Sequence, residues 1–154
     1  MYKTNNMINV VGGVLINNNK IILAKRAYSL KNFPGLFEFP GGKLEIGESN
    51  KDALIRELNE ELDININDSD IYEFRGNQSA HTIEENGKII NLTLLLVKKW
   101  NGCIKIKPGI HDKLDYVNIK DLDKFNGLIP GDDKFVKAIQ HYFKNWIEYK
   151  LYYI

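Results

Sequence analysis

Three glutamates in one segment, Glu57, Glu60 and Glu61, have a spacing that could hold a metal ion. On a helix, which advances about 100° per residue, positions i, i+3 and i+4 share one flank, so the three carboxylates are expected to converge. Like charges this close repel each other, and a divalent cation removes the repulsion. Because Mg²⁺ binds carboxylate oxygens together with the phosphate oxygens of a substrate, the pattern indicates metal-assisted chemistry on a phosphoanhydride.

The residues around these acids favour the same chemistry. Arg56 can reach Glu60 along the helix or bend toward Glu57, and a guanidinium fixes a carboxylate more firmly than a lysine does. Before the helix, the glycines of Pro40-Gly41-Gly42 let backbone groups approach a metal or a phosphate. Acidic helix faces are usually solvated surface, but the glycine loop, Glu48, Arg56 and the glutamates in one fixed register favour a metal site.

A helix over residues 49–62 is expected to position the acids. Its apolar side chains recur at helical spacing on a face away from the glutamates, at Leu54, Ile55, Leu58 and Leu62. Ser49 is a good N-cap, and Asp52 three residues later resembles a capping box.

The rest of the chain predicts an α+β fold. Residues 8–16 and 21–25 form a predicted β-hairpin around an asparagine-rich turn, and a short strand over 36–39 enters the glycine loop. Further strands are expected over 71–74, 89–100, 104–107 and 116–119, and a closing helix over 132–149. Without an internal repeat or a linker, residues 1–154 are expected to form a single domain between two main helices.

Composition narrows the class of partner. The formal net charge of +1 gives no long-range field for a polyanion, so a small nucleotide is expected and duplex nucleic acid is not. Cys103 is the only cysteine, which excludes an internal disulfide and a four-thiolate zinc site. The apolar run 10–16 is too short for a membrane span and lacks a cleavage site, so a cytoplasmic protein with no membrane contact is expected.

Residues 42–64, GKLEIGESNKDALIRELNEELDI, resemble the Nudix box, G-x5-E-x7-R-E-U-x-E-E-x-G-U, in which U is aliphatic. The matching positions are Gly42, Glu48, Arg56, Glu57, Leu58, Glu60, Glu61 and Ile64. Asp63 stands where the family has the glycine that ends the helix in a left-handed conformation. Aspartate tolerates that conformation better than a β-branched residue does, so a small loss of stability is expected, and no loss of activity.

The resemblance implies a fold and a set of site residues. The fold would be an α/β/α sandwich around a mixed sheet, with a catalytic loop-helix after the Pro-Gly-Gly turn and a C-terminal helix. Glu60 and Glu61 would be metal ligands, Glu57 a ligand or the general base, and the Gly42 carbonyl a further ligand. Arg56 would orient Glu57. The cofactor would be Mg²⁺, with Mn²⁺ as a substitute, and water would attack a phosphorus atom of a nucleoside diphosphate linked to another group.

Residues 36–43, LFEFPGGK, resemble the MutT-like branch of this family, which hydrolyses nucleoside triphosphates to monophosphate and pyrophosphate. The expected substrate is therefore a (d)NTP, with oxidised forms such as 8-oxo-dGTP included. Arg26 either contacts phosphate or is a solvated strand end, and Asp132 either reads the base or caps the last helix. Glu38 and Phe39 are expected to line the base pocket, unless Phe39 simply packs in the core.

Two further regions have alternative interpretations. Residues 110–116 resemble a loop that often contributes another glutamate near the metal, but Ile110 stands at that position. Either His111 or Asp112 compensates for the missing glutamate, or the histidine is merely a solvated loop residue.

The aromatic tail could stack on a base, although its helical spacing favours core packing or a dimer contact. The chain is therefore expected to be a monomer or a homodimer. The aromatic residues of the tail are Tyr142, Phe143, Trp146, Tyr149, Tyr152 and Tyr153.

Rival functions belong to two classes. The first is a Nudix hydrolase acting on ADP-ribose, a dinucleoside polyphosphate, coenzyme A or an mRNA cap. The chain has no proline between Pro40 and Pro108, and therefore lacks a downstream proline that resembles a mark of ADP-ribose hydrolases. Cap hydrolysis would be helped by a basic RNA-binding surface, which the charge balance does not supply. The second class is a non-catalytic nucleotide sensor, in which broken metal ligands are expected, whereas those residues are intact here.

Overall fold

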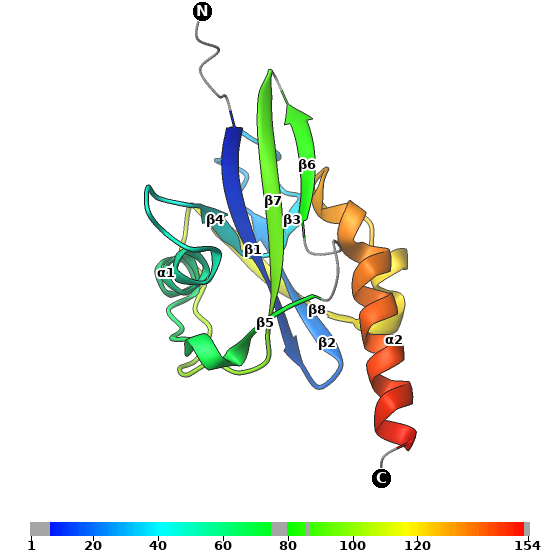
Figure 1. Ribbon diagram of the computed structural model, residues 1–154. Helices are drawn as coiled ribbons and strands as arrows, with labels where there is room; N and C mark the ends of the chain where they lie inside the picture. Colours follow the sequence, from blue (N-terminus) through cyan, green and yellow to red (C-terminus); the bar gives the residue numbers. More distant parts are fainter. Residues whose placement is uncertain (1–6, 75–79, 86, 153–154) are drawn as a thin grey trace, which may run out of the picture.

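A mixed β-sheet lies between two helices in the computed structural model, which describes residues 7–74, 80–85 and 87–152 (Figure 1). The strands are β1 (Met7–Asn17), β2 (Lys20–Arg26), β3 (Phe37–Glu38), β4 (Gly41–Lys43), β5 (Ile71–Glu73), β6 (Ala80–Glu85), β7 (Lys88–Val97) and β8 (His111–Asn118). The helices are α1 (Asn50–Leu62) and α2 (Val136–Tyr152), with 3-10 turns η1 (Asp68–Asp70), η3 (Ile119–Lys124) and η4 (Asp132–Phe135). This arrangement is the predicted α/β/α sandwich.

Strand β1 organises the sheet. It runs parallel to β7 from Met7 to Leu15, and it pairs antiparallel with β2 at one end and with β4 nearer the other. The predicted β1–β2 hairpin is confirmed: Asn17 pairs with Lys20, and the two asparagines between them are both left-handed, with φ of 50° at Asn18 and 62° at Asn19. Positive φ at both turn residues is typical of the type I′ turn that joins two-residue hairpins.

Successive side chains on the central strands point to opposite faces of the sheet, so the core has two layers. On β7, Leu94 and Leu96 face the α2 side, whereas Leu95 and Val97 face the α1 side. The stripe predicted on α1 packs in the second layer, where Leu54, Leu58 and Leu62 are fully buried. A Cβ on Gly13 of β1 would lie 3.2 Å from Leu54 Cδ1, so a glycine there lets α1 pack tightly against the sheet.

Helix α1 begins and ends as the sequence indicated. The Ser49 hydroxyl accepts from the Asp52 N–H at 3.1 Å and donates to the Asp52 carboxylate at 2.8 Å. At the other end, Asp63 adopts the left-handed conformation, with φ of 58° and ψ of 32°, and its N–H donates to the Asn59 carbonyl at 3.1 Å. The helix therefore stops where the family's glycine would stop it, but with an aspartate.

Several predicted boundaries differ from the structure. Residues 104–107 are not a strand, because the Lys105 N–H donates to the Leu62 carbonyl at 2.9 Å and so helps to close the end of α1. Strand β8 starts at His111, within the predicted loop 110–116, and the closing helix starts as η4 before α2. Strands β4 and β6 were not predicted. The glycines of β4 suggested a loop, yet they pair with β1, where a Cβ on Gly41 would collide with the Val11 carbonyl.

In the part of the chain that the structure describes, no helix is long and apolar enough to cross a bilayer.

Replacing Asp63 with glycine is expected to stabilise the protein. Glycine adopts the left-handed conformation without the cost that a Cβ brings, which is roughly 1 kcal/mol. The exposed Lys105–Asp63 ion pair, at 3.6 Å, contributes little in comparison. Thermal unfolding of D63G should show a melting temperature about 2–4 °C higher. Asp63→Asn, which also tolerates this conformation, is the control and should change little; a lower melting temperature for D63G would contradict the assignment of strain to Asp63.

Candidate active site

The glycine strand β4 and helix α1 meet at Glu57. Gly42 pairs with Val11 of β1, and a Cβ on Gly42 would fall on the carboxylate of Glu57. Any side chain at position 42 would therefore displace Glu57. The first glycine of the box-like segment is required by this close approach, in addition to any role of its carbonyl.

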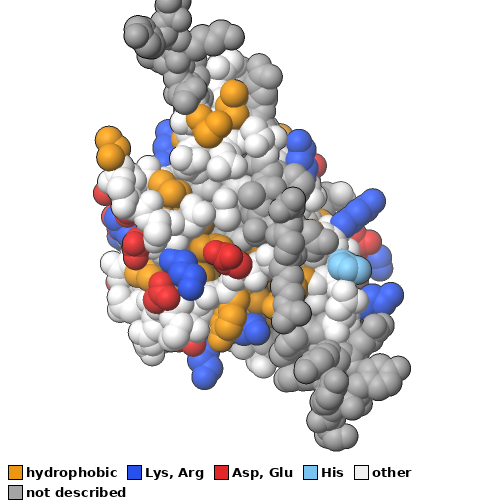
Figure 2. Space-filling view, in the orientation of Figure 1, with side chains coloured by type: hydrophobic (Ala, Val, Ile, Leu, Met, Phe, Trp, Pro, Cys, Tyr) orange, Lys and Arg blue, Asp and Glu red, His pale blue; other side chains and the backbone are white. Residues whose placement is uncertain are grey.

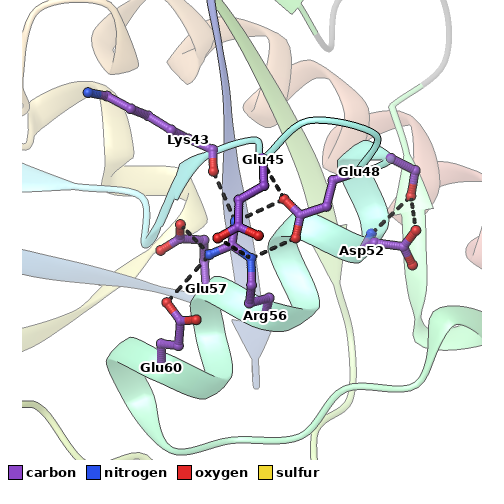
Figure 3. A network of polar contacts seen from close by, with 8 residues as sticks. Lys43, Glu45, Glu48, Asp52, Arg56, Glu57 and Glu60 are labelled. Atoms are coloured by element: carbon purple, nitrogen blue, oxygen red, sulfur yellow. Dashed lines mark hydrogen bonds and ion pairs between the residues drawn. The ribbon is translucent and has the colours of Figure 1, made fainter.

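Arg56 is the centre of a network of acids at the start of α1, as Figure 3 shows. Its Nε and Nη2 donate to the two oxygens of Glu48 at 2.6 and 2.9 Å, which is a bidentate pair. Its Nη1 donates to Glu57 Oε1 at 2.8 Å and to Glu60 Oε2 at 3.4 Å. Both partners considered in the sequence are therefore engaged at once, with Glu57 at the shorter distance.

The same guanidinium also fixes the loop that enters the helix. Arg56 Nη2 donates to the Lys43 carbonyl at 3.0 Å, and Glu48 Oε2 accepts from the Glu45 N–H at 2.8 Å. The hydrogen bonds from Arg56 and from the Glu45 backbone lower the pKa of Glu48 to about 2, and those to Glu48 and Glu57 raise the pKa of Arg56. Glu48 matched the family pattern, but no role was predicted for it, because its partner is eight residues away and depends on the loop conformation.

The three glutamates predicted to converge have different environments. The Glu57 side chain is 15% exposed and held by Arg56, whereas Glu60 is 57% exposed. Glu61 is turned inward, and its Oε2 is buried without a hydrogen-bond partner. Among the described residues no three His, Cys, Asp or Glu side chains are already gathered round one metal position. The expected close cluster is therefore wrong in detail: the acids share a flank without sharing one point.

Glu61 nevertheless fits a site for a cation. Its pKa is raised to about 8, first by burial and then by the negative charges of Glu38 and Glu57, while the Gly41 N–H and Arg26 oppose the shift. A buried carboxylate oxygen with no donor, facing two other carboxylates, lacks a positive partner. A divalent ion would supply one, and Glu57 and Glu61 are the carboxylates that would hold it.

A cavity of about 450 Å³ opens next to the glycine strand. All four residues predicted to bind substrate line it, namely Arg26, Glu38, Phe39 and Asp132, together with Gly41 and Gly42. Its remaining wall is largely apolar, with Val10, Ile90, Leu92, Ile129 and Pro130. The cavity thus has an apolar part suited to a flat ring and a polar edge at the glycines that border Glu57.

Arg26, Glu38 and His111 form a second network beside the cavity. Arg26 Nη1 donates to Glu38 Oε2 at 2.9 Å, and His111 Nε2 lies 2.9 Å from Glu38 Oε1. Arg26 is therefore not a solvated strand end. His111 is not a solvated loop residue either, because it lies on β8 with 1% of its surface exposed. Asp112 accepts from the Tyr28 N–H at 3.3 Å on the exposed surface.

Asp132 also lines the cavity and is 3% exposed. Its Oδ2 accepts from the Phe39 N–H at 2.8 Å, so it does not cap α2, which begins four residues later. Burial, followed by the charges of Glu38 and Asp133, raises its pKa to about 8, against the lowering effect of the Phe39 N–H. Phe39 combines both predicted roles, since it lines the cavity and is 4% exposed in the α2-side core.

The described part of the aromatic tail packs inside the protein. Tyr142 makes edge contacts with Phe74 and Phe143, each with ring centroids 5.2 Å apart, and Phe143 is buried in the core. Base stacking by these two rings is therefore wrong. The side chains of Trp146, Tyr149, Tyr152 and Tyr153 lie outside the described residues.

Charges of both signs lie side by side on the face shown in Figure 2, most visibly over the α1 side. Hydrophobic side chains form small separate patches between them. This mixture agrees with the net charge of +1 and with a small substrate.

The stability of the metal-free protein is expected to fall as the pH rises from about 4.5 to about 8. In this range the unfolded chain has ionised its Glu61 and Asp132 equivalents, whereas the folded protein retains both protons, because each folded pKa is raised to about 8. The folded state then binds more protons than the unfolded state, and stability decreases with pH. Urea unfolding in EDTA at pH 5, 6, 7 and 8 measures the slope.

Three variants test the origin of that slope. Glu61→Gln should reduce it, and the double variant with Asp132→Asn, which keeps an acceptor for the Phe39 N–H, should remove most of it. Glu60→Gln is the matched control, since Glu60 is largely exposed. A wild-type slope in the double variant would show that other groups are responsible.

Comparison with known proteins gives a family model, two relatives and a solved structure, each with wide coverage. The family model described as NUDIX domain matches residues 7–139. The chain is 37% identical over 132 residues to the CTP pyrophosphohydrolase of Escherichia coli (strain K12), which covers 86% of this chain and 90% of that protein. It is 36% identical over 123 residues to the 8-oxo-dGTP diphosphatase of Buchnera aphidicola subsp. Schizaphis graminum, covering 80% and 86%. The solution structure of the E. coli ORF135 protein superposes with a TM-score of 0.73 at 32% identity, covering 88% and 89%.

Proposed function

This chain belongs to the Nudix hydrolase family, and from that premise we propose that it hydrolyses a nucleoside triphosphate to a nucleoside monophosphate and pyrophosphate. Two relatives that cover most of its length, a CTP pyrophosphohydrolase and an 8-oxo-dGTP diphosphatase, support a (d)NTP as the substrate class, oxidised forms included. Similarity to an ADP-ribose pyrophosphatase and to an mRNA cap hydrolase extends over only 33% and 35% of the chain.

One observation carries the proposal: a single cavity joins an apolar ring site to the glycine strand against which Glu57 rests. A nucleoside triphosphate has the same two parts, a flat base and a run of phosphates. With the base between Phe39, Leu92 and Asp132, the phosphates would extend toward Arg26 and the Gly41-Gly42 edge. This orientation brings the phosphoanhydride, which is the bond to be cut, close to the acidic helix.

Each predicted residue then has a role. Glu57 accepts the proton of the attacking water, and Arg56 fixes its rotamer through the 2.8 Å bond. Glu60, Glu61 and the Gly42 carbonyl, together with Glu57, are the proposed metal-binding groups. Arg26 holds a phosphate oxygen. Buried Asp132, with its raised pKa, can donate to or accept from the edge of the base.

Nudix hydrolases in general use divalent metal ions, and Mg²⁺, with Mn²⁺ as a substitute, suits the all-oxygen set of groups here. When bound, such an ion neutralises phosphate charge and lowers the pKa of water. The chain's own contribution is a buried, unpaired Glu61 oxygen beside a Glu57 held in place by Arg56.

A substrate panel with Mg²⁺ or Mn²⁺ tests this proposal. The expected result is release of pyrophosphate and monophosphate from one or more normal or oxidised (d)NTPs, at higher kcat/KM than from ADP-ribose, a dinucleoside polyphosphate or capped RNA. Product analysis by anion-exchange chromatography separates pyrophosphate release from stepwise loss of single phosphates. Turnover of ADP-ribose or cap alone would overturn the proposed substrate class, while leaving the family membership intact.

Removing either inner carboxylate is expected to reduce turnover. Glu57→Gln removes the proposed base, which typically contributes 10²–10⁴-fold, and Glu61→Gln removes a proposed metal-binding group, so kcat should fall by about 10²-fold or more in each. Thermal unfolding should show that both variants fold, because each replacement relieves repulsion between carboxylates. Glu73→Gln on β5 makes the same chemical change at an exposed position and should retain wild-type kcat. Wild-type rates in E57Q and E61Q would exclude this mechanism.

A further inference from the structure

We propose that His111 is a positioning residue for Arg26, acting through the carboxylate of Glu38. The proposal rests on the proposed function in one respect, namely that Arg26 holds a substrate phosphate. It adds a residue of β8, far in sequence from the Nudix box, to the groups that determine how tightly that phosphate is held.

The contacts form a continuous chain from the core to the cavity. His111 Nε2 lies 2.9 Å from Glu38 Oε1, and the other oxygen of Glu38 accepts from Arg26 Nη1 at 2.9 Å. Arg26 Nε donates to the Asn32 carbonyl at 2.9 Å. Two edges of the guanidinium are therefore fixed by protein oxygens, and Arg26, Glu38 and Asn32 all line the cavity. The histidine is buried behind them and holds the carboxylate from its far side.

Each oxygen of the Glu38 carboxylate has one partner, Arg26 on Oε2 and His111 on Oε1. One ion pair with Arg26 restrains only one of its oxygens. A second donor on Oε1 fixes the plane of the carboxylate, and with it the direction in which Oε2 receives Arg26.

The state of the imidazole follows from its surroundings. Since Nε2 faces a carboxylate oxygen, it carries the proton and donates. Nδ1 is buried with no hydrogen-bond partner, and a lone pair is better tolerated there than an N–H, which would be a buried donor without an acceptor. The structure therefore assigns the Nε2–H tautomer to His111.

Sheet pairing places these residues together. His111 is the cross-strand partner of Arg26, and the register of β2 against β8 shifts between Lys25 and Arg26. Such a bulge re-aims the side chain that follows it, here the guanidinium over Glu38. The contacts among His111, Glu38 and Arg26 thus join three strands of the sheet, β8, β3 and β2.

The test compares His111→Gln with His111→Met. The two side chains are similar in size, but only glutamine can donate to Glu38. H111M should raise KM for the best (d)NTP roughly tenfold while kcat changes less than about threefold, because Arg26 contributes to phosphate binding and not to bond cleavage. H111Q should restore KM to within about threefold of wild type. Equal KM values in H111M and H111Q, with both variants folded by thermal unfolding, would overturn the proposal.

A double-mutant cycle separates positioning from a general structural role. In an Arg26→Gln background, H111M should produce no further rise in KM, since the residue through which His111 acts is gone. A purely structural role predicts that the two effects add, and additive effects would overturn the proposal.

Nuclear magnetic resonance gives a readout independent of turnover. The ¹⁵N shifts of His111 should report the Nε2–H tautomer, and the Arg26 Nε–H should exchange with water several-fold faster in H111M than in wild type or H111Q. These results stand even if no (d)NTP is hydrolysed, in which case the proposed function fails and the positioning chain does not. The opposite tautomer, or unchanged exchange in H111M, would refute the positioning role itself.

Discussion

The guanidinium of Arg56 is the interaction on which the acidic helix depends. Its three nitrogens reach Glu48, Glu57, Glu60 and the Lys43 carbonyl, so it connects β4 and the loop after it to the middle of α1. Glu48 and Glu57 are each about 15% exposed and would repel each other without it. A lysine has no planar fork with which to hold both oxygens of Glu48 while also reaching Glu57. One cation therefore fixes the loop, the proposed base and the start of the helix together.

Arg26 likewise holds a carboxylate in place beside the cavity, but on different elements. There the acid is Glu38 on β3, and the additional donor is His111 on β8. Two arginines thus hold two sets of acids. Glu61 receives a hydrogen bond from the Gly41 N–H, but its Oε2 is buried with no hydrogen-bond partner. Because the arginines are largely committed to protein oxygens, Glu61 is the carboxylate that a cation would complete.

The helix and its chemistry were predictable because their signals are local. The spacing of Leu54, Leu58 and Leu62, the Ser49 cap and the run of acids all lie within one segment, and β1, β2 and α1 are as expected. The predictions that failed depend on distant partners. Residues 104–107 alternate like a strand, but they close the end of α1 through Lys105, and the glycines of β4 become a strand only because β1 is beside them.

The same contrast between local signals and distant partners holds for the site residues. Arg26, Glu38, Phe39 and Asp132 were named from their resemblance to a known branch, and the structure brings all four to one cavity. Burial of His111 could not be predicted, because β8 begins in a stretch of charged residues that suggested a loop. The convergence of Glu57, Glu60 and Glu61 was overstated for a related reason: helical geometry fixes the flank, while neighbouring side chains decide where each carboxylate points. Arg56 forms hydrogen bonds with Glu57 and Glu60, whereas the Glu61 side chain is turned into the protein.

Glu38 acts electrostatically on two buried acids of the site. Its charge raises the pKa of Glu61 beside the acidic helix and that of Asp132 beside the base site, and Arg26 lowers both. The two charges of the Arg26–Glu38 ion pair therefore have opposite effects on the pKa of Glu61 and on that of Asp132. The orientation of the pair determines the net shift at each acid. His111 holds the other oxygen of Glu38, so residues of three strands, β2, β3 and β8, determine the orientation of this ion pair and its effect on both acids.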